Sequence, residues 1–173
     1  MEIISSKDNK KIKEARKLLT KKYRKNSYLI EGFHLLEEAL KAGRSIKQIF
    51  VEENKLTKLT EMIGSEKLLT DLSVNLVSKE VLKSLADSES PQGLIAEVTK
   101  IEEVIDFSAA KFLLLENVQD PGNVGTMIRT ADAAGFSAVI LLGETADIYS
   151  PKVMRSMPVS YTHLRAHETR HDL

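Results

Sequence analysis

The stretch KFLLLENVQDPGNVGTMIRTADAAGFSAVILLG, residues 111–143, decides the fold of this part of the chain. It opens with an apolar run at residues 112–115, which is typical of a strand buried on both faces of a parallel sheet. Helical spacing of apolar residues then predicts a helix that ends at Gly135, with Asp120 as N-cap and Pro121 as first residue. A second apolar run, residues 138–142, completes a β-α-β unit. Its polar strand-to-helix turn is where α/β sheets bind ligands.

Several polar residues of this turn have no evident packing role. Gly122, Gly125, Thr126 and Arg129 fall on one helical face by their spacing. Glycines let a ligand approach the backbone closely, a helix N-terminus favours anions, and an arginine offers a planar charged fork for phosphate or ribose oxygens. Turn geometry, close packing and a surface ion pair explain the same residues equally well, so the pattern leaves both interpretations open.

The two common nucleotide-binding fingerprints do not occur in the chain. No G-x-G-x-x-G follows a predicted strand, and no G-x-x-x-x-G-K-[ST] is present. These observations disfavour a nicotinamide enzyme and a phosphate-loop nucleotidase.

Upstream of this unit, short apolar runs alternate with helical patterns, which indicates a small α/β domain over residues 1–98. Residues 99–110 are charged and non-periodic, and we interpret them as a linker. The expected strands are residues 27–30, 46–51, 74–77 and 93–98, and the expected helices are residues 5–25, 31–42, 55–63 and 78–85.

The charge of the chain is unevenly distributed. Residues 1–25 hold ten Lys or Arg against three acidic residues, a net charge of +7, although the whole chain has a net charge of zero. A basic end on an acidic body indicates contact with a polyanion, and a solvated helix face is the alternative. The candidate RNA contacts in this segment are Arg16, Lys21, Lys22 and Arg24.

Composition excludes several classes of site. The chain has no Cys, so disulfides and thiolate metal sites are absent. It shows no apolar signal core near the N-terminus and no apolar run as long as a membrane span. We therefore expect a cytoplasmic protein with no membrane partner and no metal.

Residues 119–136, QDPGNVGTMIRTADAAGF, resemble the first motif of the SpoU/TrmH-type RNA 2′-O-ribose methyltransferases of the knotted SPOUT class. Residues 29–40, LIEGFHLLEEAL, and 90–98, SPQGLIAEV, resemble the RNA-binding domain that precedes the catalytic domain in that family. That domain is itself similar to kink-turn-binding ribosomal proteins. Residues 145–156, TADIYSPKVMRS, continue the family pattern. The matching core of the motif is Asn123, Gly125, Arg129, Thr130 and Ala131.

The resemblance implies an α/β chain with a small RNA-binding domain, residues 1–98, followed by the first part of a knotted methyltransferase domain, residues 111–156. It also implies methyl transfer from S-adenosylmethionine to a ribose 2′-hydroxyl, with ribosomal RNA as the expected substrate, and a homodimer.

Within this resemblance, Arg129 matches the catalytic arginine and Asn123 the motif asparagine, while Gly122 and Gly125 are expected beside RNA. A guanidinium stays protonated in proteins, so Arg129 is expected to hold ribose or phosphate and stabilise a developing alkoxide rather than act as a base. Glu116 and Asn117 are weaker candidates, and solvation of a strand end is the preferred explanation of Glu116.

The chain also departs from the family pattern. Its later motifs are not found, so the cofactor-binding residues cannot be assigned. We expect the chain by itself to be inactive and to expose apolar strand residues at 113–115 and 139–142. A non-enzymatic RNA-binding module is the alternative function.

The last segment, MPVSYTHLRAHETRHDL at residues 157–173, resembles a translated sequencing adapter and is expected to be a non-native tail. The spacing of His163, His167 and His171 within this segment would align them on one helical face, as in some metal sites. Because we expect the segment to be a non-native tail, we do not interpret them as a metal site.

Overall fold

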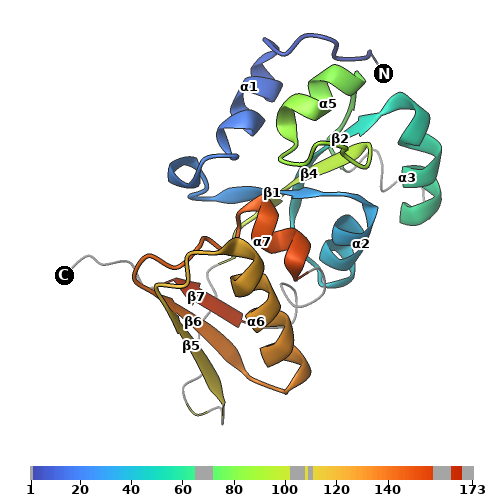
Figure 1. Ribbon diagram of the computed structural model, residues 1–173. Helices are drawn as coiled ribbons and strands as arrows, with labels where there is room; N and C mark the ends of the chain where they lie inside the picture. The colour runs from blue at the N-terminus through green and yellow to red at the C-terminus, as the bar shows by residue number, and fades with distance from the viewer. Residues whose placement is uncertain (1, 65–71, 102–107, 109–110, 158–164, 169–173) are drawn as a thin grey trace. The chain divides into compact units, whose positions relative to one another are not determined.

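The computed structural model describes residues 2–64, 72–101, 108, 111–157 and the backbone of 165–168 (Figure 1). The chain divides into two compact units, Met1–Lys100 and Ile101–Leu173. We describe each unit by itself and call them the N-terminal and the C-terminal unit. Within the described residues, no helix is both long and apolar enough to cross a membrane.

The N-terminal unit is built on a four-stranded sheet in the order β1-β4-β2-β3. Strand β4 runs antiparallel to both of its neighbours, whereas β2 and β3 are parallel. The last strand of the unit in sequence therefore lies between the first two. The strands are β1 Ser27–Glu31, β2 Ile46–Glu52, β3 Val74–Val77 and β4 Leu94–Thr99.

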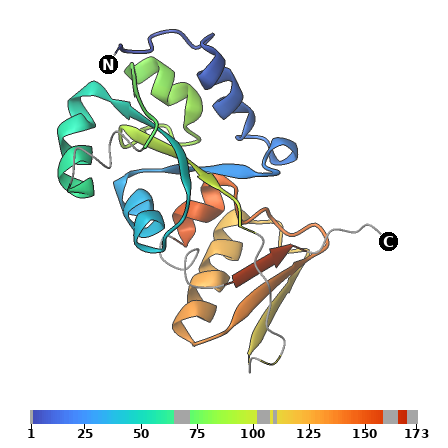
Figure 2. The same ribbon diagram turned by 180° about the vertical axis from the view of Figure 1, so that it is seen from behind.

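Helices cover both faces of this sheet (Figures 1 and 2). On one face, α1 and α5 pack over a core that includes Leu29, Phe50 and Ile95. On the other face lies α2, and α3 is next to it, since Lys58 Nζ is 4.4 Å from the centroid of the Phe33 ring. The helices are α1 Lys10–Lys17, α2 Phe33–Lys41, α3 Leu56–Ile63 and α5 Lys79–Leu85, with short 3-10 turns η1 Lys21–Tyr23 and η2 Glu53–Lys55.

The C-terminal unit has three parallel strands in the order β5-β6-β7. Helix α6 connects the first two strands, and α7 packs against α6. The elements are β5 Phe112–Glu116, α6 Pro121–Ala133, β6 Ala138–Leu142, α7 Pro151–Ser156 and β7 Arg165–Glu168.

Most predicted elements are present, with one clear difference near the N-terminus, whereas α7 and β7 lie where the sequence analysis names no helix or strand. The helix expected over residues 5–25 is only α1, because its C-cap Leu18 is followed by the 3-10 turn η1. Strand β7 lies inside the segment interpreted as a non-native tail. The side chains of His163, His167 and His171 lie outside the described residues, as does most of the interpreted linker.

The prediction of exposed apolar strands is only partly correct. Leu114 is 57% exposed, but Leu115, Val139 and Leu141 are buried. The register pairs Leu115 with Leu141, so the buried residues share one face of the sheet and Leu114 lies on the other. On the face that carries Leu115, Val139 and Leu141 these residues are buried, whereas among the described residues of the opposite face Leu114 is exposed, Ile140 is half-buried and Ala138 is buried.

Candidate functional site

The turn between β5 and α6 is closed by a side-chain cap. Asp120 Oδ1 accepts a hydrogen bond from the backbone N–H of Asn123 at 2.7 Å, and Pro121 occupies the first helical position. This arrangement satisfies one of the free N–H groups of the helix start and fixes where the helix begins. The predicted cap and helix start are thus confirmed.

The two predicted catalytic residues both lie on the exposed surface of α6. Asn123 is in its first turn and Arg129 in its third, and both side chains are exposed. Neither side chain makes a hydrogen bond or an ion pair with another residue that the structure describes. Both are therefore available to an external partner, and the same exposure is seen at Gly122.

Gly125 has a different role from the one expected of it. It is buried, and a Cβ atom placed on it would collide with Cβ of Ser156 and lie 3.1 Å from the carbonyl oxygen of Val153. The missing side chain lets α7 approach α6, so the predicted contact of Gly125 with RNA is corrected to a helix-packing role. Close packing is one of the two interpretations that the sequence pattern allows for Gly125.

Hydrogen bonds connect the loops that follow β5 and β6. Asn117 adopts the left-handed conformation, with φ of 55°, and its Oδ1 accepts a hydrogen bond from the backbone N–H of Glu144 at 2.9 Å. The hydroxyl oxygen of buried Thr145 lies 3.0 Å from the carbonyl oxygen of Leu115 and 2.6 Å from that of Leu142. The candidate residue Glu116 is exposed at the end of β5.

These contacts also test whether a cofactor fits at this edge. The polar groups of Asn117 and Thr145 are engaged with backbone groups of the same edge, and no buried polar atom is left without a partner among the described residues of the C-terminal unit. Among the described residues, the polar groups at this edge are therefore engaged within the chain and are not left over for S-adenosylmethionine, and we derive no chemical step through it.

Three of the four cations expected to contact RNA are exposed, namely Arg16, Lys21 and Lys22. The fourth, Arg24, is only 6% exposed, and its Nη1 donates a hydrogen bond to the carbonyl oxygen of Leu18 at 2.7 Å. The carbonyl at the end of α1 needs a donor, and this guanidinium supplies it. The prediction that Arg24 contacts RNA is therefore corrected to a structural role.

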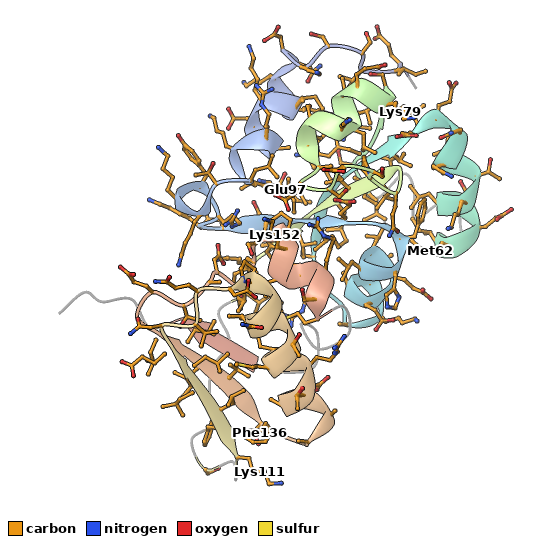
Figure 3. The ribbon with its side chains drawn as sticks, in the orientation of Figure 1. Met62, Lys79, Glu97, Lys111, Phe136 and Lys152 are labelled. Atoms are coloured by element: carbon orange, nitrogen blue, oxygen red, sulfur yellow. The ribbon has the colours of Figure 1, made fainter. Side chains whose placement is uncertain are left out.

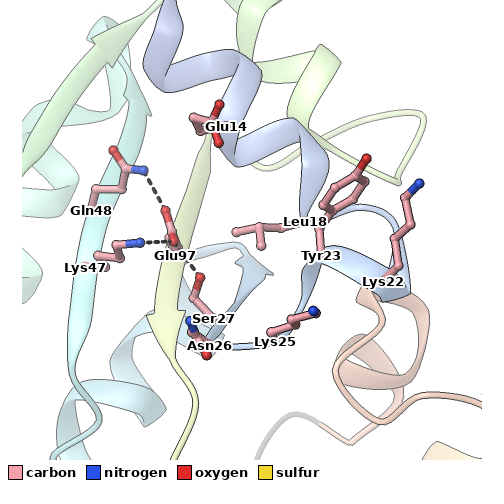
Figure 4. A pocket seen from close by; sticks show the side chains of 10 residues that line it. All are labelled: Glu14, Leu18, Lys22, Tyr23, Lys25, Asn26, Ser27, Lys47, Gln48 and Glu97. Atoms are coloured by element: carbon pink, nitrogen blue, oxygen red, sulfur yellow. Dashed lines mark hydrogen bonds and ion pairs between the residues drawn. The ribbon is translucent and has the colours of Figure 1, made fainter.

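A cavity of about 700 Å³ lies beside these cations and was not foreseen from the sequence (Figure 4). Glu97, only 4% exposed and deep in the N-terminal unit (Figure 3), forms part of its wall. Its Oε1 accepts hydrogen bonds from Ser27 Oγ at 2.7 Å and Lys47 Nζ at 3.0 Å, and its Oε2 accepts one from Gln48 Nε2 at 2.6 Å. Across the cavity lies Tyr23.

The hydrogen bonds determine the ionisation of Glu97. Burial acts to raise its pKa, but the bonds from Ser27, Gln48 and Lys47, with the charge of Lys47, outweigh burial and hold the pKa of Glu97 below its usual value. The cavity wall therefore carries a carboxylate anion at neutral pH. Glu97 lies in β4 and its partners lie in β1 and β2, so periodicity along any one segment could not reveal the cavity.

One further cluster has metal-ligand chemistry. Ligand atoms of His34, Glu37 and Glu38 on α2 lie within 4.8 Å of one another. Lys41 Nζ already lies 2.9 Å from Glu37 and 3.2 Å from Glu38. Because the Lys41 ammonium group already contacts both carboxylates, we assign no metal to them.

The family follows from two matches that together cover most of the chain. Residues 9–96 match the MRM3-like substrate binding domain, and residues 110–172 match the SpoU rRNA Methylase family. The chain belongs to the SpoU rRNA methylase family, and its fold is the mixed α/β fold of that family. The second match extends into residues 157–173, and the interpretation of that segment as a non-native tail stays a prediction.

Individual relatives are consistent with this assignment. The chain is 42% identical over 166 residues to the 23S rRNA (guanosine(2553)-2′-O)-methyltransferase RlmP of Bacillus subtilis, with 95% of this chain and 64% of that protein covered. It is 34% identical over 136 residues to the mitochondrial rRNA methyltransferase 3 of Homo sapiens, which covers 74% of this chain and 31% of the relative.

Solved structures agree with both matches. An RNA 2′-O ribose methyltransferase superimposes with a TM-score of 0.77 at 34% identity, over 98% of this chain and 66% of its own. An AdoMet-bound rRNA methyltransferase from Sinorhizobium meliloti superimposes with a TM-score of 0.80 at 28% identity, over 96% and 64%. The chain thus spans less than two thirds of the length of the two curated relatives, 64% of one and 31% of the other.

Proposed function

We propose that this chain contributes the RNA-binding domain and the arginine-bearing part of the site of an RNA 2′-O-ribose methyltransferase. The proposed substrate is ribosomal RNA, and the proposed methyl donor is S-adenosylmethionine. The observation that carries the proposal is Arg129, exposed on α6 without a partner among the described residues, within a segment that belongs to the SpoU family. A homodimer and a cytoplasmic location are part of the same proposal.

The proposed role of Arg129 follows from the chemistry of a guanidinium. It donates several hydrogen bonds in a fixed plane and stays charged, so it can hold a ribose or phosphate oxygen and stabilise negative charge as a hydroxyl loses its proton. It cannot remove that proton itself. Asn123, in the first turn of the same helix, offers both an amide donor and a carbonyl acceptor for positioning the ribose.

The proposed contact with RNA also includes the basic surface of the N-terminal unit. Arg16, Lys21 and Lys22 are exposed, whereas Lys13 and Lys17 are ion-paired with Asp8 and Glu14 at 2.9 and 2.8 Å. Phosphate contacts of this kind supply affinity that does not depend on sequence and falls as salt rises. These residues equally support the second candidate function, a non-enzymatic RNA-binding module.

A chimera distinguishes the two functions. Residues 1–156 are joined to the portion of the Bacillus subtilis relative that follows its counterpart of Ser156, and the protein is incubated with labelled S-adenosylmethionine and ribosomal RNA. We expect label in dinucleotides that resist alkali, because a methylated 2′-oxygen cannot attack the neighbouring phosphate. Arg129→Ala should lower the rate at least about 100-fold while RNA affinity changes little.

The result that contradicts the enzyme is RNA binding without any methyl transfer by the chimera. The chain alone is assayed in parallel, and we expect it to bind RNA without transferring label. Methyl transfer by the chain alone would contradict the expectation that it is inactive and would support the enzyme.

A further inference from the structure

The cavity beside Glu97 combines three chemical features that one ligand could use together. Tyr23 is 45% exposed and lines the cavity, with Lys22 Nζ 4.8 Å from the centroid of its ring. Lys22 and Lys25 also line it and form no ion pair with the residues that the structure describes. Figure 4 shows Glu97 with its three donors on one side and Tyr23 on the other.

The carboxylate of Glu97 has acceptor capacity left. Its Oε1 already receives two hydrogen bonds, but Oε2 receives only the one from Gln48. A carboxylate oxygen can accept two. Since Asn26 and Gln48 also line the cavity, its wall offers both acceptors and amide groups to a flat polar ligand.

The size and chemistry of the cavity match a nucleotide better than a simple anion. Its volume of about 700 Å³ falls within the range of cavities that hold small organic ligands. An aromatic ring next to lysines is the combination that binds unpaired nucleotides, since bases stack on the ring and cations contact the phosphates. A base also carries N–H groups on its edge, for which Glu97 is a suitable acceptor.

We propose that this cavity binds one unpaired nucleotide of the RNA, with its base stacked on Tyr23 and its N–H edge donating to Glu97. Lys22 and Lys25 contact the adjoining phosphates. The inference rests on the proposed function, because it takes RNA as the ligand, and it assigns a defined subsite to the N-terminal unit. It predicts that the unit distinguishes single-stranded from fully paired RNA.

The test uses the full chain and two labelled RNAs of mixed sequence. One is a single strand of about ten nucleotides and the other is a fully paired duplex. Affinity for each is measured by fluorescence anisotropy at one fixed salt concentration. Tyr23→Ala should weaken binding of the single strand roughly 5- to 150-fold, as expected for the loss of one stacked base. Tyr23→Phe keeps the ring and should stay within about twofold of the original chain. Duplex binding should change little in either variant.

A 2-aminopurine base in the single strand gives a second readout. Its fluorescence should be quenched when it stacks on Tyr23 and on Phe at that position, and not in Tyr23→Ala. The proposal is overturned if Tyr23→Ala binds the single strand as the original chain does, or if it weakens both RNAs equally. In either case RNA binding itself stands, whereas a chain that binds neither RNA would contradict the proposed function as well.

Discussion

Gly125→Ala tests whether Gly125 serves helix packing or ligand access. The added methyl would collide with Cβ of Ser156 and come within 3.1 Å of the carbonyl oxygen of Val153. Neither of those atoms can rotate away, because a Cβ and a carbonyl oxygen are both fixed by the backbone of α7. Helix α7 must therefore shift to admit the methyl group.

Two opposing contributions set the size of the effect. Overpacking a close contact costs about 1–3 kcal/mol, and alanine gains about 1 kcal/mol over glycine inside a helix. Because the collision is with rigid atoms, we expect a cost in the upper half of that range. The C-terminal unit should lose about 1–2 kcal/mol net.

Amide hydrogen exchange of α6 and α7 measures this change locally. A loss of about 1.4 kcal/mol makes exchange tenfold faster where it proceeds through unfolding of the unit. The matched control is the same substitution in a Ser156→Gly background, where the colliding Cβ is absent, and there Gly125→Ala should cost at least about 1 kcal/mol less. If Gly125→Ala instead slows exchange as expected from helix propensity alone, the packing explanation is refuted.

Three other outcomes follow from the contacts described above. The pKa of Glu97 is lowered in the folded state, so the ionised carboxylate stabilises the fold above the usual carboxyl pKa. This stabilisation is lost as the pH falls through the pKa that Glu97 has in the folded state. Below about pH 4, the urea midpoint of the original chain should therefore fall more steeply with pH than that of Glu97→Gln. Thr145→Val removes the hydroxyl that lies beside two strand-end carbonyl groups and should lower the unfolding free energy by about 1–3 kcal/mol in urea titrations; an unchanged midpoint would contradict that role. Replacing Lys21 and Lys22 together by Ala should reduce the slope of log affinity for single-stranded RNA against log salt by about 1.4. As the control, replacing the exposed lysines of α5, Lys79 (Figure 3) and Lys83, by Ala should leave that slope unchanged.

Local signals in the sequence were sufficient for much of the fold. The strand predicted at residues 74–77 is β3, and Asp120 caps the helix that it was expected to cap. Caps and apolar periodicity depend on residues a few positions apart, so they can be read along the chain. Arg129 likewise lies on the helix that apolar periodicity predicts.

Residues whose surroundings come from distant segments were harder to predict. Arg24 stands among exposed lysines in the sequence, and only the fold shows that its guanidinium reaches the end of α1. Gly125 could not be distinguished from a ligand-facing glycine until α7 was placed against it. The donors to Glu97 include one from a residue 70 positions away in the sequence, so no local pattern marks that cavity.

The strand order of the N-terminal unit has a consequence for synthesis on the ribosome. Strands β1 and β2 do not pair with each other, because β4 lies between them. At typical elongation rates, roughly 2–10 s separate the completion of β2 from that of β4. During that interval β1 and β2, with their apolar residues Leu29 and Phe50, lack the strand that pairs with both of them, because β4 has not yet been synthesised. The nascent chain should then be a client for chaperones, and a translational pause before β4 should lengthen its exposure.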